Sequence, residues 1–567
     1  MLDATKMKMI EELVAGSQTE ELIWLNGYIA GLLAGKKGIE QPAAAVASSK
    51  PLVNKITIAY GTETGNSKTL ASSFAAKAKK AGINAKIVDL NQYRLNDLQK
   101  EEYFITIVST HGDGEPPAAA KKFFDHIHAN ALKLEKMNYG VLALGDTSYP
   151  LFCKAGEQVD LQLGKMGAQR LVPLQKCDVD FESDAEAWFE GVLKQLSSSS
   201  ASAAPAALPT VKKSTAKKIY TGTVLTSINL NDRGSNKETY HIEIEAEGVD
   251  YLPGDALGII PQNPQQKVEA IVKLLELDGD KKCTFRNEEY TAFDLLKKKV
   301  EIVYLPERVV EAYARLVNQD IPATRISLLD LLKIYPLKSS DQFEQLVAIL
   351  EPIAPRLYSI SSSPEAHSGE VHITVARDKF SVNDELKYGL CSNFLAQFQV
   401  GQEVQFYIHK NNQFRLPADD KDVIMIGPGT GIAPFRAFLA HRDSIGANGR
   451  NWLFFGDQHF VTDFLYQTEI QNWVETGSLS KIDLAFSRDQ QEKIYVQHKM
   501  KKKGKELYEW LQNGATLYVC GAKEPMSVDV ENTLVEVVQE YGSKKAEEAV
   551  EFINQLKSEG RYLKDVY

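Results

Sequence analysis

Three loops in the first third of the chain carry hydroxyl, glycine and aromatic residues that could hold a phosphorylated ring compound. The first loop contains Thr62, Glu63, Thr64, Gly65, Asn66 and Ser67, and it leads directly into a helical pattern. Hydroxyls, glycines and free amides at the N-terminus of a helix form a cradle for phosphate. The loop has no Lys, which disfavours a triphosphate P-loop. Taken alone, it could also be a plain strand-to-helix turn.

The second and third loops follow the next two apolar runs of the chain. The second contains Ser109, Thr110, His111 and Gly112, and the third contains Leu144, Gly145, Asp146, Thr147, Ser148, Tyr149, Pro150, Leu151, Phe152 and Cys153. Short apolar runs at 55–60, 103–109 and 139–144 alternate with helical patterns, which predicts a doubly wound parallel sheet. Because ligands bind outside the carboxyl ends of such strands, the three loops should converge on one crevice. An exposed Tyr149 could lie flat on a planar ring there.

These three loops, in this order, resemble those of flavodoxin-type FMN domains. The resemblance implies that the first loop holds the phosphate and that the other two surround the isoalloxazine ring. It places Tyr149 against the flavin, and His111 where relatives often carry another flat side chain. Asp178, after the next apolar run, would close the site in the same interpretation.

A second group of candidate binding residues lies between positions 356 and 392. Its three segments are Arg356-Leu357-Tyr358-Ser359, Thr374-Val375-Ala376 and Gly389-Leu390-Cys391-Ser392. The set offers a cation, an aromatic ring, several hydroxyls and a glycine that opens a helix. It could hold a pyrophosphate at the helix N-terminus while the aromatic packs a ring. An Arg and a Tyr on a barrel strand are also ordinary surface and core residues, so the order of the segments carries the interpretation.

A third group begins with the loop 427–431, Gly-Pro-Gly-Thr-Gly, which joins a predicted strand to a helix. It matches neither the P-loop pattern nor the G-x-G-x-x-G dinucleotide pattern. After a later strand come Ser487, Arg488, Lys493, Ile494, Tyr495, Val496 and Gln497. Two cations with hydroxyls suit a dianionic 2′-phosphate, which favours NADPH over NADH. A solvated cluster of Lys and Arg is the alternative.

The elements that must position these residues fall into separate units along the chain. Low-complexity stretches at 41–51 and 197–209 indicate linkers. Strand-rich stretches at 219–261 and 356–410 predict an antiparallel barrel, interrupted by a mostly helical insertion. The predicted units are an N-terminal helical segment with its linker (1–50), a flavodoxin-like domain (52–196), a flexible linker (197–217), a barrel (218–263 and 351–417), its helical insertion (264–350) and a second α/β domain (418–567).

The N-terminal segment carries an unpartnered apolar stripe. Leu22, Leu25, Ile29 and Leu32 repeat at helical intervals after a capping-box pair, Ser17 and Glu20. A single helix cannot bury such a stripe, so it docks either on its own chain or on another copy.

Composition restricts the class of protein further. The chain of 567 residues has 65 Lys and Arg against 75 Asp and Glu, a formal charge of −10, which argues against a global basic field for nucleic acid or anionic lipid. Five widely spaced cysteines with no C-x-x-C pair favour a reducing compartment and indicate no metal site. The most apolar early stretch, Ile23 to Gly35, is too short to span a bilayer. The sequence therefore predicts a soluble, cytoplasmic protein.

Residues 52–567 as a whole resemble the diflavin reductase family. The ordered segments from 356 to 521 are similar to its ferredoxin–NADP reductase module. Within the family, the segment Thr19–Gly35, the phrase Val423–Leu439 and the ending Arg561–Tyr567 are most similar to flavoprotein subunits of assimilatory NADPH–sulfite reductases. One departure is Ala522, where relatives often have Asp after the glycine. This departure bears on dinucleotide turnover near the nicotinamide.

The resemblance implies FMN, FAD and NADPH as cofactors, with electrons passing from NADPH through FAD and FMN to a metal-containing acceptor. It places Ser359, Cys520 and Asp565 around the reacting rings, Gly429, Thr430 and Asp529 at the dinucleotide, and Tyr567 over the FAD ring as a gate. Cys520 is alternatively an ordinary buried thiol. The implied partner is a sulfite reductase hemoprotein subunit with siroheme and a 4Fe–4S cluster, and the chain itself would form a homo-oligomer through its N-terminal segment. The alternatives are a reductase for another soluble haem protein and a non-catalytic module with vestigial flavin sites.

Overall fold

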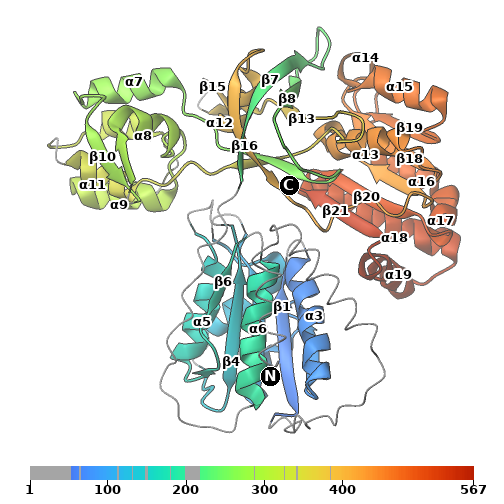
Figure 1. The fold of residues 1–567 in the computed structure, drawn as a ribbon, viewed down its shortest axis with the longest axis horizontal. Coiled ribbons are helices and arrows are strands. Elements are labelled where there is room, and N and C mark those ends of the chain that lie inside the picture. Colours follow the sequence, from blue (N-terminus) through green and yellow to red (C-terminus); the bar gives the residue numbers. More distant parts are fainter. Residues whose placement is uncertain are drawn as a thin grey trace, which may run out of the picture.

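The chain folds into three lobes, which Figure 1 shows as a lower α/β lobe, a central sheet with a helical extension, and a second α/β lobe. The computed structural model describes residues 53–62, 65–111, 114–129, 132–146, 151–178, 181–197, 218–286, 288–322, 324, 326–339, 342–382 and 385–567. The predicted assembly segment at 1–50 and positions 198–217 of the predicted linker lie outside these residues. No helix among the described residues has the length and apolar character needed to cross a membrane.

The first lobe is a doubly wound sheet. Its strands are β1 (Lys55–Gly61), β2 (Asn84–Asp89), β3 (Tyr103–Ser109), β4 (Asn138–Leu144), β5 (Gln169–Arg170) and β6 (Gln175–Cys177). The order is β2-β1-β3-β4-β5, all parallel, with β6 also pairing with β4. β1, β3 and β4 are almost wholly buried, because a parallel sheet is covered on both faces and its central strands are continuous apolar runs.

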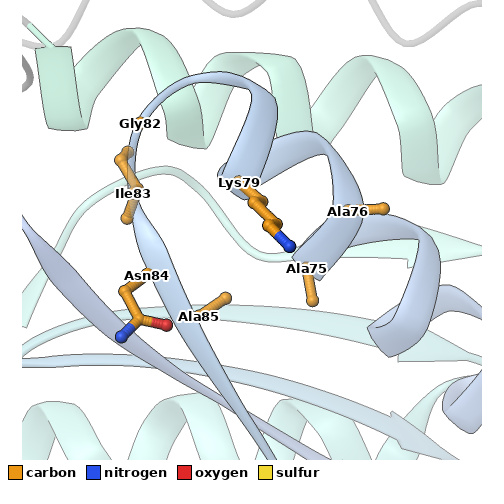
Figure 2. Close-up of a pocket in the computed structure, with 7 residues that line it drawn as sticks. All are labelled: Ala75, Ala76, Lys79, Gly82, Ile83, Asn84 and Ala85. Carbon is orange, nitrogen blue, oxygen red and sulfur yellow. The ribbon is translucent and has the colours of Figure 1, made fainter.

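Helices on both faces of this sheet supply the cover. They are α3 (Asn66–Lys80), α4 (Lys121–Ala129), α5 (Lys154–Lys165) and α6 (Glu182–Ser197), with the short 3-10 turns η1 (Leu95–Lys100) and η2 (Ala118–Ala120). Phe74 of α3 stacks on Phe189 of α6 with ring centroids 4.1 Å apart. A hollow lined by Lys79, Ile83 and Asn84 lies between the end of α3 and the start of β2 (Figure 2). It is at the amino ends of the strands, the opposite edge from the three predicted binding loops.

The central lobe is an antiparallel sheet of six strands. They are β7 (Ile219–Asn229), β8 (Thr239–Glu245), β9 (Ala256–Ile259), β12 (Arg356–Ser359), β13 (Glu370–Ala376) and β16 (Glu403–His409). The order is β12-β9-β16-β7-β8-β13, and an antiparallel bridge between Ile360 and Ile373 joins its two ends. The hairpin of β14 (Lys379–Val382) and β15 (Glu385–Tyr388) and the helix α12 (Leu390–Ala396) follow β13.

The helical insertion packs around a core of its own. Its helices are α7 (Gln265–Leu274), α8 (Ala292–Lys298), α9 (Glu307–Val317), α10 (Leu328–Ile334) and α11 (Gln342–Ile349). The insertion also contains a hairpin, β10 (Lys282–Phe285) with β11 (Glu288–Thr291), in a stretch for which the sequence predicted mostly helix. Figure 1 shows this unit projecting away from the second α/β lobe.

The second α/β lobe has a five-stranded parallel sheet. Its strands are β17 (Val423–Ile426), β18 (Asn451–Asp457), β19 (Lys481–Phe486), β20 (Thr516–Gly521) and β21 (Tyr562–Val566), in the order β19-β18-β17-β20-β21. Its helical segments are η3 (Gly429–Ile432), α13 (Ala433–Ser444), α14 (Phe460–Asp463), α15 (Gln467–Thr476), α16 (Val496–Lys502), α17 (Gly504–Gln512), η4 (Lys523–Ser527), α18 (Val528–Gly542) and α19 (Ala546–Ser558). The predicted fold class is confirmed: two parallel α/β sheets flank an antiparallel sheet.

A buried polar cluster joins the central sheet to the second α/β lobe. His241 of β8 and His372 of β13 are 4% and 1% exposed, and Arg436 of α13 lies beside them. Burial lowers the pKa of both imidazoles, to about 2 for His372, and the charge of Arg436 acts in the same direction. Both rings are therefore neutral at pH 7. The charged and titratable groups around them are Glu243, Glu370, Glu469, His367 and Tyr466.

This cluster should make the folded chain sensitive to acid. An unfolded histidine takes up a proton near pH 6.5, whereas these two stay neutral in the fold, so their contribution to stability is complete above that pH and falls below it. Each should remove up to about 1.4 kcal/mol per pH unit from the free energy of unfolding. We expect His372→Gln to give a shallower loss between pH 6.5 and 5, measured by urea unfolding at several pH values. An unchanged slope in that variant would contradict this assignment.

Candidate flavin and dinucleotide sites

The three loops of the first lobe meet at one edge of its sheet. β1 and β3 are neighbours, yet the chain leaves β1 toward β2 on the other side, so the switch point of this topology lies between β1 and β3. The amide of Thr110 donates to the carbonyl oxygen of Leu144 (2.9 Å), and the amide of Ala155 donates to the Thr110 hydroxyl (3.2 Å). The second and third loops are thereby tied together at the carboxyl ends of their strands.

The first loop has the form of a phosphate cradle. Gly65 has φ +98°, a left-handed conformation that favours glycine, and its amide donates to the Thr62 hydroxyl (2.8 Å). The Ser67 hydroxyl in the first turn of α3 is buried and has no hydrogen-bond partner among the described residues. A buried hydroxyl without a partner is unfavourable, and a phosphate oxygen at the helix N-terminus would satisfy it. The described residues therefore fit a bound phosphate group.

The second and third loops lie at the same edge of the sheet as the first. The Ser109 hydroxyl is also buried and lacks a partner among the described residues, while His111 is exposed and pairs with Glu115 through two backbone hydrogen bonds. Cys153 begins α5 with φ +57°, and its thiol donates to the carbonyl oxygen of Ala143 (3.2 Å). A Cβ on Gly145 would lie 2.8 Å from the Cys153 amide nitrogen, so the ends of the third loop approach closely.

The structure brings together the predicted residues of this site that it describes, namely Thr62, Gly65, Asn66, Ser67, Ser109, Thr110, His111, Leu144, Gly145, Asp146, Leu151, Phe152 and Cys153. The remaining ones, Glu63, Thr64, Gly112, Thr147, Ser148, Tyr149 and Pro150, lie outside the described residues. The stacking role of Tyr149 therefore stays a prediction.

Three predicted catalytic side chains converge at the junction of the other two lobes. The Ser359 hydroxyl at the end of β12 donates to Asp565 Oδ2 (2.7 Å), and Cys520 Sγ lies 3.9 Å from the same oxygen. Cys520 and Asp565 are register partners on β20 and β21. Ser359 is 206 positions away from Asp565 in the chain, so only the packing of the two lobes makes this contact.

Burial sets the charge state of this group. It raises the pKa of the Asp565 carboxyl, against the hydrogen bond from Ser359, and it raises the pKa of Cys520 well above its usual value. The thiol is therefore neutral at pH 7 and can donate to the carboxylate. Full burial of Cys520 also agrees with its alternative as a structural thiol, but the contact with Asp565 links it to the predicted site.

The predicted FAD residues lie on β12, on β13 and at the start of α12. Arg356 and Leu357 are exposed, whereas Tyr358 is partly buried, and burial raises its pKa well above 10. A Cβ on Gly389 would lie 2.9 Å from the Ser392 hydroxyl and 3.2 Å from the Asp378 side chain, so the chain is closely packed at the N-terminus of α12.

Other members of the predicted FAD set differ in burial and in the direction of their side chains. The Thr374 hydroxyl lies 2.6 Å from the Tyr466 hydroxyl, so its side chain points toward the second α/β lobe. Val375 and Cys391 are buried in the core of the central sheet, and Leu390 is partly buried. Ala376 is exposed at the end of β13.

Loop 427–431, the predicted dinucleotide loop, packs directly against β20, the strand that carries Cys520. A Cβ on Gly431 would lie 2.2 Å from the Cys520 carbonyl oxygen, and Gly429 has φ +58°. Both glycines are therefore needed, the first for close approach and the second for its backbone conformation. The loop continues through η3 into α13. The amides of Gly427 and Gly431 donate to the carbonyl oxygens of Phe454 and Pro428 (3.0 and 3.1 Å), so those of Gly429 and Thr430 are the ones suited to a phosphate.

The last residue of the sequence is held against this loop. The Tyr567 hydroxyl lies 2.7 Å from the Thr430 hydroxyl, the Tyr567 amide donates to Gly521 O (3.1 Å), and Lys523 N donates to Tyr567 O (2.9 Å). Its side chain is nevertheless 66% exposed. An anchored aromatic with an open face beside Ser359 and Asp565 is suited to cover a flat ring.

The predicted 2′-phosphate residues gather beyond β18 and β19. The Ser487 amide and hydroxyl both donate to the Asp457 carbonyl oxygen (2.8 and 3.2 Å). Arg488 and Lys493 are exposed and form no ion pair within the described part of the chain. Tyr495 is 43% exposed where α16 begins. Of the others, Ile494 is partly buried, Val496 is buried in the core, and Gln497 donates to Asp529 (3.2 Å).

Sequence reasoning missed one cation at this site, Lys237. It belongs to the central sheet, in the connection between β7 and β8, and its ammonium donates to both carboxylate oxygens of Asp457 (2.6 and 2.7 Å). Its nitrogen is 3.9 Å from the place where a Cβ of Gly429 would lie. We infer that Lys237 faces the pyrophosphate of a dinucleotide. A lone Lys before a β-strand carries no local signal, so the sequence could not have identified it.

Lys237 and Arg488 should affect different parts of the coenzyme. We expect Lys237→Met to weaken the binding of NADP⁺ and of NAD⁺ by similar factors, about 10- to 150-fold, because both contain the pyrophosphate. Arg488→Ala should weaken the binding of NADP⁺ only, because NAD⁺ lacks the 2′-phosphate. Calorimetric titration measures both. Asp457→Asn is the matched control, because it removes the carboxylate that pairs with Lys237 and should not weaken coenzyme binding. If Asp457→Asn loses as much affinity as Lys237→Met, Lys237 serves only as a contact between the lobes.

Tyr567 should control access to the flavin. If its ring covers the isoalloxazine, a dinucleotide must displace it, and apparent affinity falls by the fraction of closed enzyme. We expect Tyr567→Ala to bind NADP⁺ more tightly and to discriminate less between NADPH and NADH, measured by titration and by steady-state rates with both coenzymes. FMN content should stay the same because that site is in another lobe. If Tyr567→Ala binds NADP⁺ and discriminates between NADPH and NADH as the parent does, Tyr567 does not act as a gate.

Comparison with known proteins agrees with this division of the chain. The family model described as Flavodoxin matches residues 58–190, the FAD binding domain matches residues 212–317 and 309–394, and the Oxidoreductase NAD-binding domain matches residues 425–532. These matches confirm the predicted cofactor set of FMN, FAD and NADPH.

Full-length relatives extend the comparison. The sulfite reductase (NADPH) flavoprotein alpha-component of Bacillus subtilis (strain 168) is 39% identical over 594 residues, which cover 99% of this chain and 98% of the relative. The protein of the same name from Shewanella sp. (strain ANA-3) is also 39% identical, over 100% of this chain and 98% of its own. The one from Klebsiella pneumoniae (strain ATCC 700721 / MGH 78578) is 38% identical, over 96% and 95%. The chain therefore belongs to the family of sulfite reductase (NADPH) flavoprotein alpha-components.

Proposed function

We propose that this protein is the NADPH-oxidising subunit of an assimilatory sulfite reductase, and that it passes electrons to a hemoprotein that reduces sulfite to sulfide. The family supports the overall reaction, since its members carry that name over the whole length of the chain. The observation that carries the proposal is the contact of Ser359 with Asp565 beside the dinucleotide loop. It joins a residue of the FAD-binding lobe to one of the dinucleotide-binding lobe at a single point.

The residues of this junction bind, orient and hold protons. Bound flavins supply the conversion between a two-electron donor and a one-electron acceptor. Ser359 holds its proton toward Asp565, and the neutral thiol of Cys520 faces the same oxygen. A carboxylate fixed in a buried place stabilises positive charge that develops on a neighbouring ring, because its position costs no reorganisation during the reaction.

The remaining parts of the site position the coenzyme. The loop at 427–431 offers the amides of Gly429 and Thr430 to the pyrophosphate, and Lys237 adds a cation from the other lobe. Arg488 and Lys493, both exposed, are suited to the 2′-phosphate. The anchored ring of Tyr567 excludes water from the flavin face until a dinucleotide replaces it.

The first lobe is placed for the outgoing electrons. Asn412 Nδ2 of the central lobe lies 3.5 Å from Glu182 at the start of α6, and Gln413 approaches Gly65 of the phosphate loop. The edge of the first lobe that carries the phosphate loop thus faces the FAD-binding lobe, which supports transfer between two flavins within one chain.

Several finer points belong to the same proposal. The acceptor is a hemoprotein subunit with siroheme and a 4Fe–4S cluster, and residues 1–50 assemble the chain into a homo-oligomer. The domain limits are those predicted from the sequence, which the ranges of the three family matches support. The cytoplasm is the compartment, as five cysteines without a disulfide favour reducing conditions.

Reconstitution tests this function. The purified chain should contain two flavins, one FMN and one FAD, and should reduce a dye with NADPH. Together with the sulfite reductase hemoprotein of the same organism it should form sulfide from sulfite, while neither subunit does so with NADPH alone. Dye reduction without sulfide would indicate another haem acceptor, and absence of flavin would indicate a non-catalytic module.

A further inference from the structure

Arg436 is a buried cation that belongs to the helix of the dinucleotide loop but binds the other lobe. It lies in the first turn of α13, which continues directly from loop 427–431, and its side chain is 6% exposed. Burying a charge is costly unless it is paired and hydrogen-bonded, so each of its contacts is informative.

Two of these contacts reach the segment just after β12 and the strand β13, both of which carry predicted flavin-site residues. Arg436 Nη1 donates to the carbonyl oxygen of Ser361 (2.8 Å) and to Nδ1 of His372 (3.1 Å). Ser361 is two positions beyond Ser359, and His372 is two positions before Thr374. One side chain from the dinucleotide helix therefore holds both segments at once.

The opposite side of the guanidinium is fixed within its own lobe. Glu469 of α15 accepts from Nε and Nη2 (2.6 and 2.8 Å), and the guanidinium carbon lies 4.9 Å from the centroid of the Tyr466 ring. The Tyr466 hydroxyl in turn lies 3.0 Å from His241 Nδ1 and 2.6 Å from the Thr374 hydroxyl. The guanidinium is thus clamped from both lobes in one orientation.

The same arrangement argues against a metal ion here. His241, Glu243 and His372 could place three ligand atoms within 4.8 Å of one another. Arginine can only donate, so Nδ1 of His372 must accept, and the proton of this neutral ring is then on Nε2, where it donates to Glu370 (2.7 Å). A protonated ring nitrogen cannot ligate a metal. The cation of this cluster is the guanidinium itself.

We propose that Arg436 is a positioning residue for hydride transfer, which sets the separation between the dinucleotide loop and the flavin-binding strands. The inference rests on the proposed function, because it assumes that NADPH and FAD occupy these two lobes. Reacting atoms must approach to about 3–3.5 Å, and a displacement of about 1 Å can cost 100-fold in rate. A contact that fixes two lobes so close to both loops therefore acts on the rate of transfer and not on either binding step.

The test compares two buried arginines of the same helix. Arg442 is 3% exposed, and it donates to the carbonyl oxygens of Lys421 (3.0 Å) and Gly449 (2.8 Å), both in its own lobe. Flavin-loaded Arg436→Met should reduce FAD with NADPH about 10- to 100-fold more slowly in rapid mixing, with a larger isotope effect for NADPH deuterated at the transferred position. Its FAD content and its affinity for NADP⁺ should match those of the parent. Arg442→Met should lose stability without slowing transfer.

Two outcomes would contradict a positioning role for Arg436. A parental transfer rate in Arg436→Met, or equal slowing in both variants, would show that Arg436 is structural only. If Arg436→Met does not fold, Arg436→Lys keeps the charge opposite Glu469 but cannot hold Ser361 and His372 together, so it should slow transfer while the fold survives. A parent that binds NADP⁺ but fails to reduce FAD would instead refute the proposed function.

Discussion

A hydride passes only between atoms that are almost in contact, and this chain builds the two halves of that contact from different lobes. The strand that ends at Ser359 belongs to the antiparallel sheet, and the strand that carries Asp565 belongs to the second parallel sheet. Three contacts join the two lobes near this junction: the hydrogen bond between the two residues, the ion pair of Lys237 with Asp457, and the hydrogen bonds of Arg436. The precision required by the chemistry explains why charged groups are buried there in spite of their desolvation cost.

The first lobe is under a different constraint. The contact of Asn412 with Glu182 at 3.5 Å and the approach of Gln413 to Gly65 connect its described residues to the central lobe. The contact of Asn412 with Glu182 is exposed to solvent, and relative motion is the default expectation between domains of one chain. An electron carrier that must meet both an internal donor and an external acceptor requires that freedom, whereas a hydride site does not tolerate it.

Local sequence was informative where a ligand is bound by backbone and by neighbours in the chain. The loops after β1, β3 and β4 were predicted from their glycines and hydroxyls, and the structure gathers the described ones at one edge of a sheet. The dinucleotide loop was equally recognisable, because Gly429 and Gly431 are needed for a left-handed turn and a close approach. The strand Tyr562–Val566 was not predicted from its own pattern, because five residues carry little periodicity. Only the resemblance of the segment Arg561–Tyr567 to the family pointed to it.

By itself, the sequence determined the order of the lobes, the fold class of each and the cofactors they suit, because hydrophobic period and turn chemistry are local properties. It could not determine which distant side chains meet. Lys237 faces Asp457 across 220 positions, Arg436 faces His372 across 64, and the Thr374 hydroxyl meets the Tyr466 hydroxyl across 92. These pairings depend on how two separately folded lobes pack, and a buried charge or hydroxyl selects its partner only when that packing removes it from water.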